Sequence, residues 1–361
     1  MKKELGSNFW ISEDFFIDKT YDEESIFRKL NLTGDSHLFS TARQAVRFVL
    51  QDISPDKKRA LLPEYTCHSV IDPFLKEGYD IFYYPVDKKL RLSLSKVNSL
   101  IEKYDIGVFL FHPYFGFDSL IEDEKISSQV KVIYDATQTM YSSFDYDFYD
   151  YKVGSIRKWA EVLDGAFAEK KTGSFTKTFD FVEDDKLTSL MMEASQLKYE
   201  YMEEDRGDKK EFLRLYSAGL NAIRQAKEIF AMSSRSKLVV DNLNLEELKE
   251  SRRSNFSKLL SYPNWDKIGQ PVFSKLDDQV VPLYFPLHLK VDRRDFQGHL
   301  AQNDIYAPII WSKPDIYESR QVDEDVAWIY EHTLSIPVDQ RYGIDDMDRL
   351  LKVIDEYWSK K

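Results

Sequence analysis

The feature that most constrains the fold is the alternation of short apolar runs with helical patterns in the first half of the chain. Apolar residues recur on one face of residues 41–53 at helical spacing, and residues 59–62 then form a short predicted strand that ends at Pro63. A second helical stretch ends at Gly78, and residues 81–84 form the next predicted strand. Strands that alternate with helices predict an α/β fold with a mostly parallel sheet flanked by helices.

Three polar segments each follow a predicted strand. Pro63–Thr66 follows the first strand, His112–Tyr114 follows the apolar run 106–111, and Asp135–Gln138 follows the run Val132–Tyr134. In parallel sheets, ligands gather beyond the carboxyl ends of the strands. We therefore expect the three segments to converge on one rim of the sheet. For His112 alone, a structural role is the favoured interpretation, with a place in the binding pocket as the alternative.

The second half of the chain has a different pattern, in which strands and helices are mixed. We therefore predict a large domain over residues 1–235 and a smaller C-terminal α+β domain over residues 236–361. The elements expected here are helices within 185–232, interrupted by an acidic turn at 203–208, helices at 245–260, 292–303 and 345–358, and strands at 280–289 and 333–338.

The composition limits the classes of ligand. Of the 361 residues, 43% are hydrophobic, which is enough for a sizeable core, and the net charge of −12 provides no basic field for nucleic acid or an anionic membrane. Cys67 is the single cysteine, so an intramolecular disulfide is excluded, and the histidines lack the spacing of a metal site. We expect no metal, no nucleic acid and no membrane partner.

The start of the chain does not resemble a targeting segment. Met1–Gly6 contains two lysines but no apolar run follows, and no stretch reaches the ~18 apolar residues of a membrane span. The sequence therefore favours a cytoplasmic enzyme or a cytoplasmic binding protein.

Asp135 and Lys158 are the residues that point most directly to a chemistry. Asp135 ends an apolar run, and Lys158 lies between Gly154-Ser155 and an apolar segment. Pyridoxal phosphate (PLP) requires a carboxylate that keeps its pyridine nitrogen protonated and a lysine that supplies a Schiff-base amine. The alternatives are a cap or turn role for Asp135 and a solvated surface position for Lys158. Lys152 is a rival lysine, although its segment looks more like an ordinary strand edge.

The order of several segments resembles the DegT/StrS family of sugar aminotransferases, and the likeness spans nearly the whole chain. This resemblance implies the fold of type I PLP-dependent transferases, with a seven-stranded type of sheet in the large lobe. The segments that carry the resemblance are Thr41–Val46, Pro63–Thr66, Asp135–Gln138, Ser155–Trp159, Arg252–Phe256 and Leu334–Tyr342.

The resemblance also implies roles for single residues. Lys158 would form the Schiff base, Asp135 would pair with the pyridine nitrogen, and Gln138 would contact the phenolic oxygen. The turn at residues 41–43, formed by Thr41, Ala42 and Arg43, would offer backbone amides to the cofactor phosphate, as the start of a helix favours an anion. Plain helix capping by Ser40 or Thr41 is an equal alternative for that turn. Ser155 would add a hydroxyl to the phosphate site.

The chain departs from the family pattern beside the cofactor and in the substrate pocket. Where the family often has an aromatic residue that stacks on the ring, this chain has Cys67 followed by His68, and either side chain is a candidate. The segments on both sides of Lys158 also differ from the family. The second lobe offers two candidates for substrate contacts, the segment Trp311–Pro314 and the side chain of Arg341. The alternative for both is a solvated loop.

By resemblance, the expected function is PLP-dependent transfer of an amino group from an amino acid, glutamate in particular, to a nucleotide-linked keto sugar by a homodimer. The lysine favours transamination, because related dehydratases carry a histidine there. Two alternatives remain: a PLP enzyme of the same fold with a non-sugar substrate, and a non-catalytic member of the fold.

Overall fold

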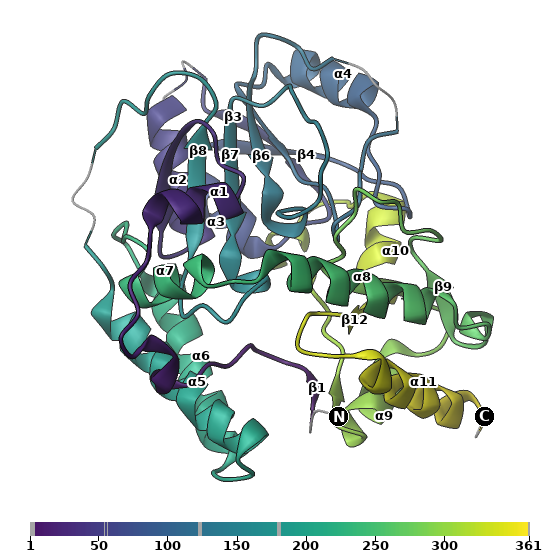
Figure 1. The fold of residues 1–361 in the computed structure, drawn as a ribbon. Helices are drawn as coiled ribbons and strands as arrows, with labels where there is room; N and C mark the ends of the chain where they lie inside the picture. Colours follow the sequence, from purple (N-terminus) through teal and green to yellow (C-terminus); the bar gives the residue numbers. More distant parts are fainter. Residues whose placement is uncertain (1–3, 54, 56, 122–124, 179–181, 360–361) are drawn as a thin grey trace.

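The computed structural model describes residues 4–53, 55, 57–121, 125–178 and 182–359. Its centre is a seven-stranded sheet in the order β2-β8-β7-β6-β5-β3-β4 (Figure 1). Neighbours from β4 to β7 are parallel, whereas β8 is antiparallel to both β7 and β2, which confirms the predicted mostly parallel sheet. The strands are β2 (Asp35–Phe39), β3 (Arg59–Pro63), β4 (Asp80–Tyr84), β5 (Val108–Phe111), β6 (Lys131–Asp135), β7 (Tyr151–Ser155) and β8 (Ala166–Lys170).

The helices of the first part surround this sheet. α2 packs against β7 and β8, and α5 pairs with α6. Gly78, at a φ of +76°, follows the end of α3, where a residue without a side chain is favoured. The helices are α1 (Glu23–Lys29), α2 (Ala42–Ile53), α3 (His68–Lys76), α4 (Leu94–Tyr104), α5 (Asp185–Glu203), α6 (Lys209–Gln225) and α7 (Ser234–Asp241), with single 3-10 turns η1 (Glu13–Phe16), η2 (Ala136–Gln138) and η3 (Ile156–Lys158).

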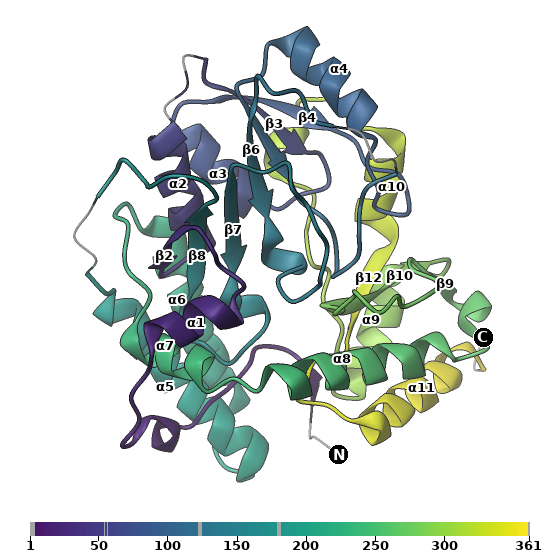
Figure 2. The ribbon, with the colours of Figure 1, turned by 45° about the horizontal axis from the view of Figure 1, so that its top comes forward.

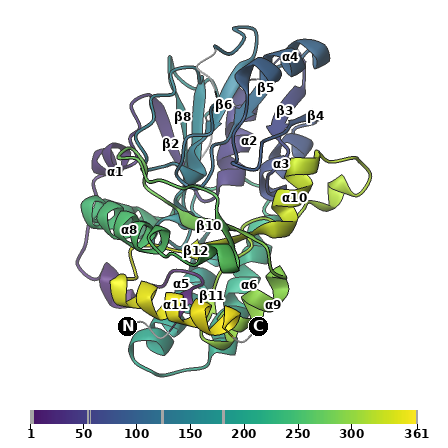
Figure 3. The same ribbon diagram turned by 90° about the vertical axis from the view of Figure 1, so that its right-hand side faces the viewer.

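The C-terminal part is built on an antiparallel sheet of order β12-β10-β9, which lies below the large sheet in Figure 3. The strand predicted at 280–289 begins only at Tyr284, because residues 280–283 precede the ladder with β12. Its elements are β9 (Gly269–Pro271), β10 (Tyr284–Leu289), β11 (Ile305–Tyr306), β12 (Thr333–Pro337), α8 (Leu245–Leu260), α9 (Arg293–Gln302), α10 (Glu324–His332), α11 (Ile344–Trp358), η4 (Trp265–Lys267) and η5 (Asp315–Tyr317).

The start of the chain joins this C-terminal part. β1 (Leu5–Gly6) pairs in parallel with β11, and the Tyr342 hydroxyl contacts both backbone groups of Gly6, at 2.8 Å from N and 3.1 Å from O. Figure 2 accordingly shows both termini beside the C-terminal lobe. The boundary predicted near residue 235 falls within α7, and the partition into two domains remains a prediction. Among the described helices, none is long and apolar enough to cross a membrane.

Candidate active site

A cavity of about 300 Å³ lies at the carboxyl ends of the parallel strands. The cavity therefore lies at the rim of the sheet where the polar segments after the strands were predicted to converge. Of the cofactor-site residues predicted from the sequence, the cavity is lined by Thr41, Ala42, Arg43, Cys67, Asp135, Gln138, Ser155 and Lys158. His68 is the exception, because it is exposed at the start of α3 and does not line the cavity, so Cys67 is the residue of that pair beside the candidate cofactor position.

The structure separates the two candidate lysines. Lys158 ends the turn η3 and faces the cavity, and within the described residues its amine has no hydrogen bond or ion pair. Lys152 lies on β7, an interior strand and not the strand edge that the sequence suggested, and is 6% exposed. Its amine donates to the carbonyl of Asn31 at 3.0 Å. Lys158 is therefore the lysine with an amine that is free to react.

The environment of Lys158 favours its neutral form. Burial of the ammonium group among protein atoms lowers its pKa, and the neighbouring guanidiniums of Arg157 and Arg43 lower it further, against an opposing contribution from Cys67. The side chain is nevertheless exposed to the cavity, which is open. A neutral, accessible amine is the form that attacks a carbonyl carbon.

Asp135 is held as a carboxylate by two partners. It ends β6 and is 5% exposed, with Oδ1 accepting a hydrogen bond from the Thr137 backbone N–H at 3.0 Å. Its Oδ2 lies 3.1 Å from Nδ1 of His112. Burial would raise the pKa of Asp135, but His112 and Thr137 outweigh it and hold the pKa below its ordinary value. His112 itself lines the cavity, which is the alternative to the structural role favoured from the sequence.

Thr137, a residue that the sequence did not single out, ties the two turns of the site together. Its Oγ1 accepts a hydrogen bond from the backbone N–H of Ser155 at 3.1 Å, and its carbonyl accepts one from Trp159 Nε1 at 2.7 Å. These contacts fix η2, which follows Asp135, against η3, which ends at Lys158. No sequence signal marks Thr137, because a threonine after a strand is common and its partners lie far along the chain.

The start of α2 forms another wall of the cavity. The carbonyl of Thr41 accepts hydrogen bonds from the N–H groups of Gln44 and Ala45, as in a first helical turn. The N–H groups of Ala42 and Arg43 have no acceptor in the described part of the chain. Unpaired amides at the start of a helix favour an anion. The guanidinium of Arg43 lies 3.8 Å from Asp72, and Arg224 of α6 also lines this wall.

Side chains from the rest of the rim complete the cavity. Oε1 of Gln138 accepts a hydrogen bond from the Phe115 N–H at 2.7 Å, so its predicted contact with the cofactor remains a prediction. Trp311 lines the cavity and packs on His112, with ring centroids 5.3 Å apart. Arg341 does not line this cavity, because it forms a buried ion pair with Asp339.

These residues fit pyridoxal phosphate. The cavity offers an unpaired lysine amine, an ionised buried carboxylate and unpaired amides at a helix start, which complement the aldehyde, the pyridine nitrogen and the phosphate. Its volume is at the lower end of the range for small-molecule sites. Within the described residues, no cluster of His, Cys, Asp and Glu is arranged to hold a metal ion.

Solved structures with the same fold include proteins described as sugar aminotransferases. The putative sugar aminotransferase Spr1654 of Streptococcus pneumoniae, in its PLP form, aligns at 12% identity over 99% of each chain with a TM-score of 0.66. AtS13 of Actinomadura melliaura aligns at 14% identity over 98% of each chain, with a TM-score of 0.65.

A third structure is Helicobacter pylori PseC, an aminotransferase of pseudoaminic acid biosynthesis, at 12% identity over 98% of this chain and 100% of that one, with a TM-score of 0.64. No protein-family model matches the sequence, and comparison with curated proteins gives no match. The likeness therefore establishes the fold, which is that of the type I PLP-dependent aminotransferases.

Proposed function

We propose that this protein is a PLP-dependent aminotransferase. The observation that carries the proposal is that the unpaired amine of Lys158 and the ionised carboxylate of Asp135 line the same cavity. When bound there, PLP withdraws electrons from the α-carbon of an attached amino acid. The fold shared with solved sugar aminotransferases supports the same assignment.

The residues of the cavity would each have a separate role in binding the cofactor or in proton transfer. Lys158 would hold the cofactor through its amine, and the same amine would serve as the base that takes a proton from the donor's α-carbon. Asp135, oriented by His112, would keep a proton on the pyridine nitrogen. The amides of Ala42 and Arg43 would bind the phosphate together with the hydroxyl of Ser155, and Gln138 would contact the phenolic oxygen.

We further propose that glutamate is the amino donor and a nucleotide-linked keto sugar the acceptor, in the cytoplasm. The resemblance of the sequence motifs supports this, as do the solved neighbours described as sugar aminotransferases. A different keto substrate would leave the cofactor spectrum unchanged but give no turnover of nucleotide keto sugars. A non-catalytic protein of this fold would take up no cofactor.

Borohydride trapping tests the cofactor assignment. The protein incubated with PLP should show visible absorbance that borohydride removes, and mass spectrometry should then find a pyridoxyl group on Lys158. Lys158→Ala should lose both signals, whereas Lys152→Ala should keep them, because the Lys152 amine is held by Asn31. A trapped group on Lys152, or no trapped group in the unsubstituted protein, would contradict the proposal.

We also propose that the protein is a homodimer. Leu220 of α6 lines the cavity and is 41% exposed, so a second copy could cover this open wall. Light scattering should give a mass about twice the 42.6 kDa of the chain. A mass of one chain at micromolar concentration would contradict the dimer.

A further inference from the structure

The cavity that contains Asp135 and Lys158 has more positive than negative charge in its lining. Asp135 is its single carboxylate among the described residues, whereas three guanidiniums line it in addition to Lys158. The guanidiniums belong to Arg43, Arg157 and Arg224. The whole chain has a net charge of −12, so this concentration of cations is local. Like charges gathered in one cavity repel one another, and an anionic ligand relieves that repulsion.

Two of the three guanidiniums have no carboxylate partner in the described part of the chain. Arg157 lies in η3, and its guanidinium makes no hydrogen bond or ion pair with another described residue. Arg224 lies exposed in the last turn of α6, and its Nη1 donates to Oδ1 of Asn221 at 3.4 Å. Arg43 differs, because its guanidinium lies 3.8 Å from the carboxylate of Asp72. The charges of Arg157 and Arg224 are therefore available to a ligand.

The three guanidiniums lie close enough to affect one another's pKa. Burial lowers the pKa of Arg157, and the charge of Arg43 lowers it further, against an opposing contribution from Asp164. Burial also lowers the pKa of Arg43, and Arg224 acts in the same direction. Asp164 is fully buried and does not line the cavity, so it leaves the guanidiniums exposed to an anion there.

The end of α6 is held beside the start of α2. Nε2 of Gln44 in α2 donates to the carbonyl of Glu228 at 3.2 Å, and Nη1 of Arg47 donates to the carbonyl of Lys227 at 2.6 Å. Both carbonyls lie just beyond the end of α6, so these bonds place its last turn, with Arg224, against the helix start that carries unpaired amides. Guanidiniums and amides at a helix start are the donors that proteins use for phosphate.

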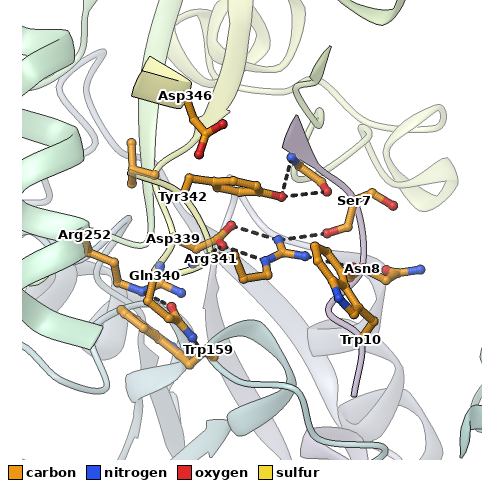
Figure 4. Close-up of polar contacts among 12 residues, drawn as sticks. Ser7, Asn8, Trp10, Trp159, Arg252, Asp339, Gln340, Arg341, Tyr342 and Asp346 are labelled. Carbon is orange, nitrogen blue, oxygen red and sulfur yellow. Dashed lines mark hydrogen bonds and ion pairs between the residues drawn. The ribbon is translucent and has the colours of Figure 1, made fainter. Parts of the chain in front are cut away.

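Two other arginines line a smaller cavity next to this one and have protein partners. Figure 4 shows Arg341 with Asp339, at 2.7 Å between Nε and Oδ1, and Arg252 with Gln340, at 3.0 Å between Nε and Oε1. Neither Arg341 nor Arg252 lines the larger cavity. The unpaired charge that faces the candidate cofactor position therefore does not come from them.

A phosphate ester is a dianion that bidentate guanidiniums bind well. We propose that Arg157 of η3 and Arg224 of α6 form a clamp for the phosphate group of the cofactor. This inference rests on the proposed function. The clamp holds the cofactor independently of a bond to Lys158. Transamination needs such an anchor, because the aminated cofactor, pyridoxamine phosphate, has no aldehyde with which the lysine could react.

Calorimetry with pyridoxamine phosphate and with pyridoxamine tests the clamp on the full chain. Neither compound has an aldehyde, so both bind without a bond to Lys158, and they differ only in the phosphate. Arg157→Gln and Arg224→Gln should each weaken pyridoxamine phosphate about ten-fold, because each removes a charge-assisted contact. Both substitutions should leave the affinity for pyridoxamine unchanged.

Arg214→Gln is the matched control, since this exposed arginine of α6 pairs with Glu211 at 2.7 Å and does not line the cavity. It should leave both affinities unchanged. Arg224 is exposed as well, and its hydrogen bond with Asn221 lies within its own helix. Arg224→Gln therefore remains informative even if Arg157→Gln folds poorly.

Uridine diphosphate, titrated into the PLP-loaded protein after borohydride reduction, separates the cofactor phosphate from a phosphate on the substrate. Its affinity should be the same in Arg224→Gln and in the unsubstituted protein, because the cofactor already occupies the clamp. Weaker binding of uridine diphosphate together with unchanged binding of pyridoxamine phosphate would overturn the clamp and assign the guanidinium to the substrate. Equal weakening of pyridoxamine and pyridoxamine phosphate would overturn it as well.

Borohydride trapping keeps the clamp and the proposed function apart. If a pyridoxyl group forms on Lys158 while neither substitution weakens pyridoxamine phosphate, the clamp is wrong and the proposed function stands. If no group is trapped while pyridoxamine phosphate alone is weakened, the proposed function fails and the phosphate site stands.

Discussion

At the scale of single residues, His112 is what distinguishes Asp135 from an ordinary carboxylate at a strand end. Burial on its own would favour the protonated acid, which could not pair with a protonated pyridine nitrogen. The contact between His112 Nδ1 and Asp135 Oδ2 at 3.1 Å reverses that preference. Lys158 shows the converse effect, since burial and two guanidiniums favour its neutral amine. The pKa values of these two common residue types are thus shifted toward the protonation states that the proposed chemistry needs.

Replacing His112 should make the site sensitive to acid. In His112→Leu the contribution of His112 that lowers the pKa of Asp135 is lost, so this pKa rises and the carboxylate becomes protonated at higher pH than in the unsubstituted protein. The visible absorbance of the PLP-loaded protein should therefore be lost at higher pH when the solution is acidified. A spectroscopic pH titration checks this, with His68→Leu, outside the cavity, as the control. Coincident titrations of His112→Leu and the unsubstituted protein would refute the role of His112.

At the scale of elements, the site depends on two single-turn helices that follow adjacent parallel strands. β6 leads into η2 and β7 into η3, and the contacts of Thr137 hold the two turns together. Gly154 lies in β7 just before the second turn, where a Cβ would meet the Phe167 ring at 2.7 Å. Because Phe167 is fully buried, it has little room to give way.

Gly154→Ala should therefore lower the free energy of unfolding by about 1–3 kcal/mol, the typical cost of overpacking. The matched substitution is Gly298→Ala in α9, where a Cβ would meet nothing within 4 Å. That change should raise the free energy of unfolding by about 0.5–1 kcal/mol through helix propensity. Urea denaturation of both variants measures the difference, and equal effects would show that Phe167 moves aside.

At the scale of the whole molecule, the N-terminal segment joins parts that are distant in the sequence. β1 extends the C-terminal lobe, Arg341 donates to the carbonyl of Asn8 at 2.9 Å, and Lys198 of α5 donates to the same carbonyl at 2.7 Å. Lys198 is fully buried, and burial followed by the charge of Arg341 lowers its pKa to about 7. The segment Ser7–Phe9, held by a buried lysine, thus lines a second cavity of about 110 Å³ beside Lys158.

The stability of the protein should therefore increase with pH just above neutrality. Above pH 7 the unfolded chain keeps a proton on Lys198 that the folded chain has lost, so the free energy of unfolding rises with pH up to the ordinary lysine pKa. This contribution is at most about 1.4 kcal/mol per pH unit. Lys198→Met should flatten the rise between pH 7 and 9 in urea denaturation, whereas the exposed Lys210→Met should not. An unchanged slope in Lys198→Met would contradict the buried lysine's role.

The sequence predicted the elements with strong periodicity and missed those without it. The helix expected at 245–260 is observed as Leu245–Leu260, and the strand expected at 59–62 as Arg59–Pro63. β2 and α10 were not predicted. β2 combines three polar residues with two apolar ones, and its strand conformation is fixed by antiparallel pairing with β8, which no local pattern reveals.

By itself, the sequence determined the parallel sheet, the polar segments at its rim and the pair Asp135 and Lys158, because periodicity and strand ends are local properties. Only the tertiary structure decided that Lys158 and not Lys152 faces the cavity, that His112 holds Asp135, and that Arg157 and Arg224 line the same cavity. These outcomes depend on which side of a strand or turn faces a neighbour. That neighbour can lie far away along the chain, so packing rather than local pattern selects it.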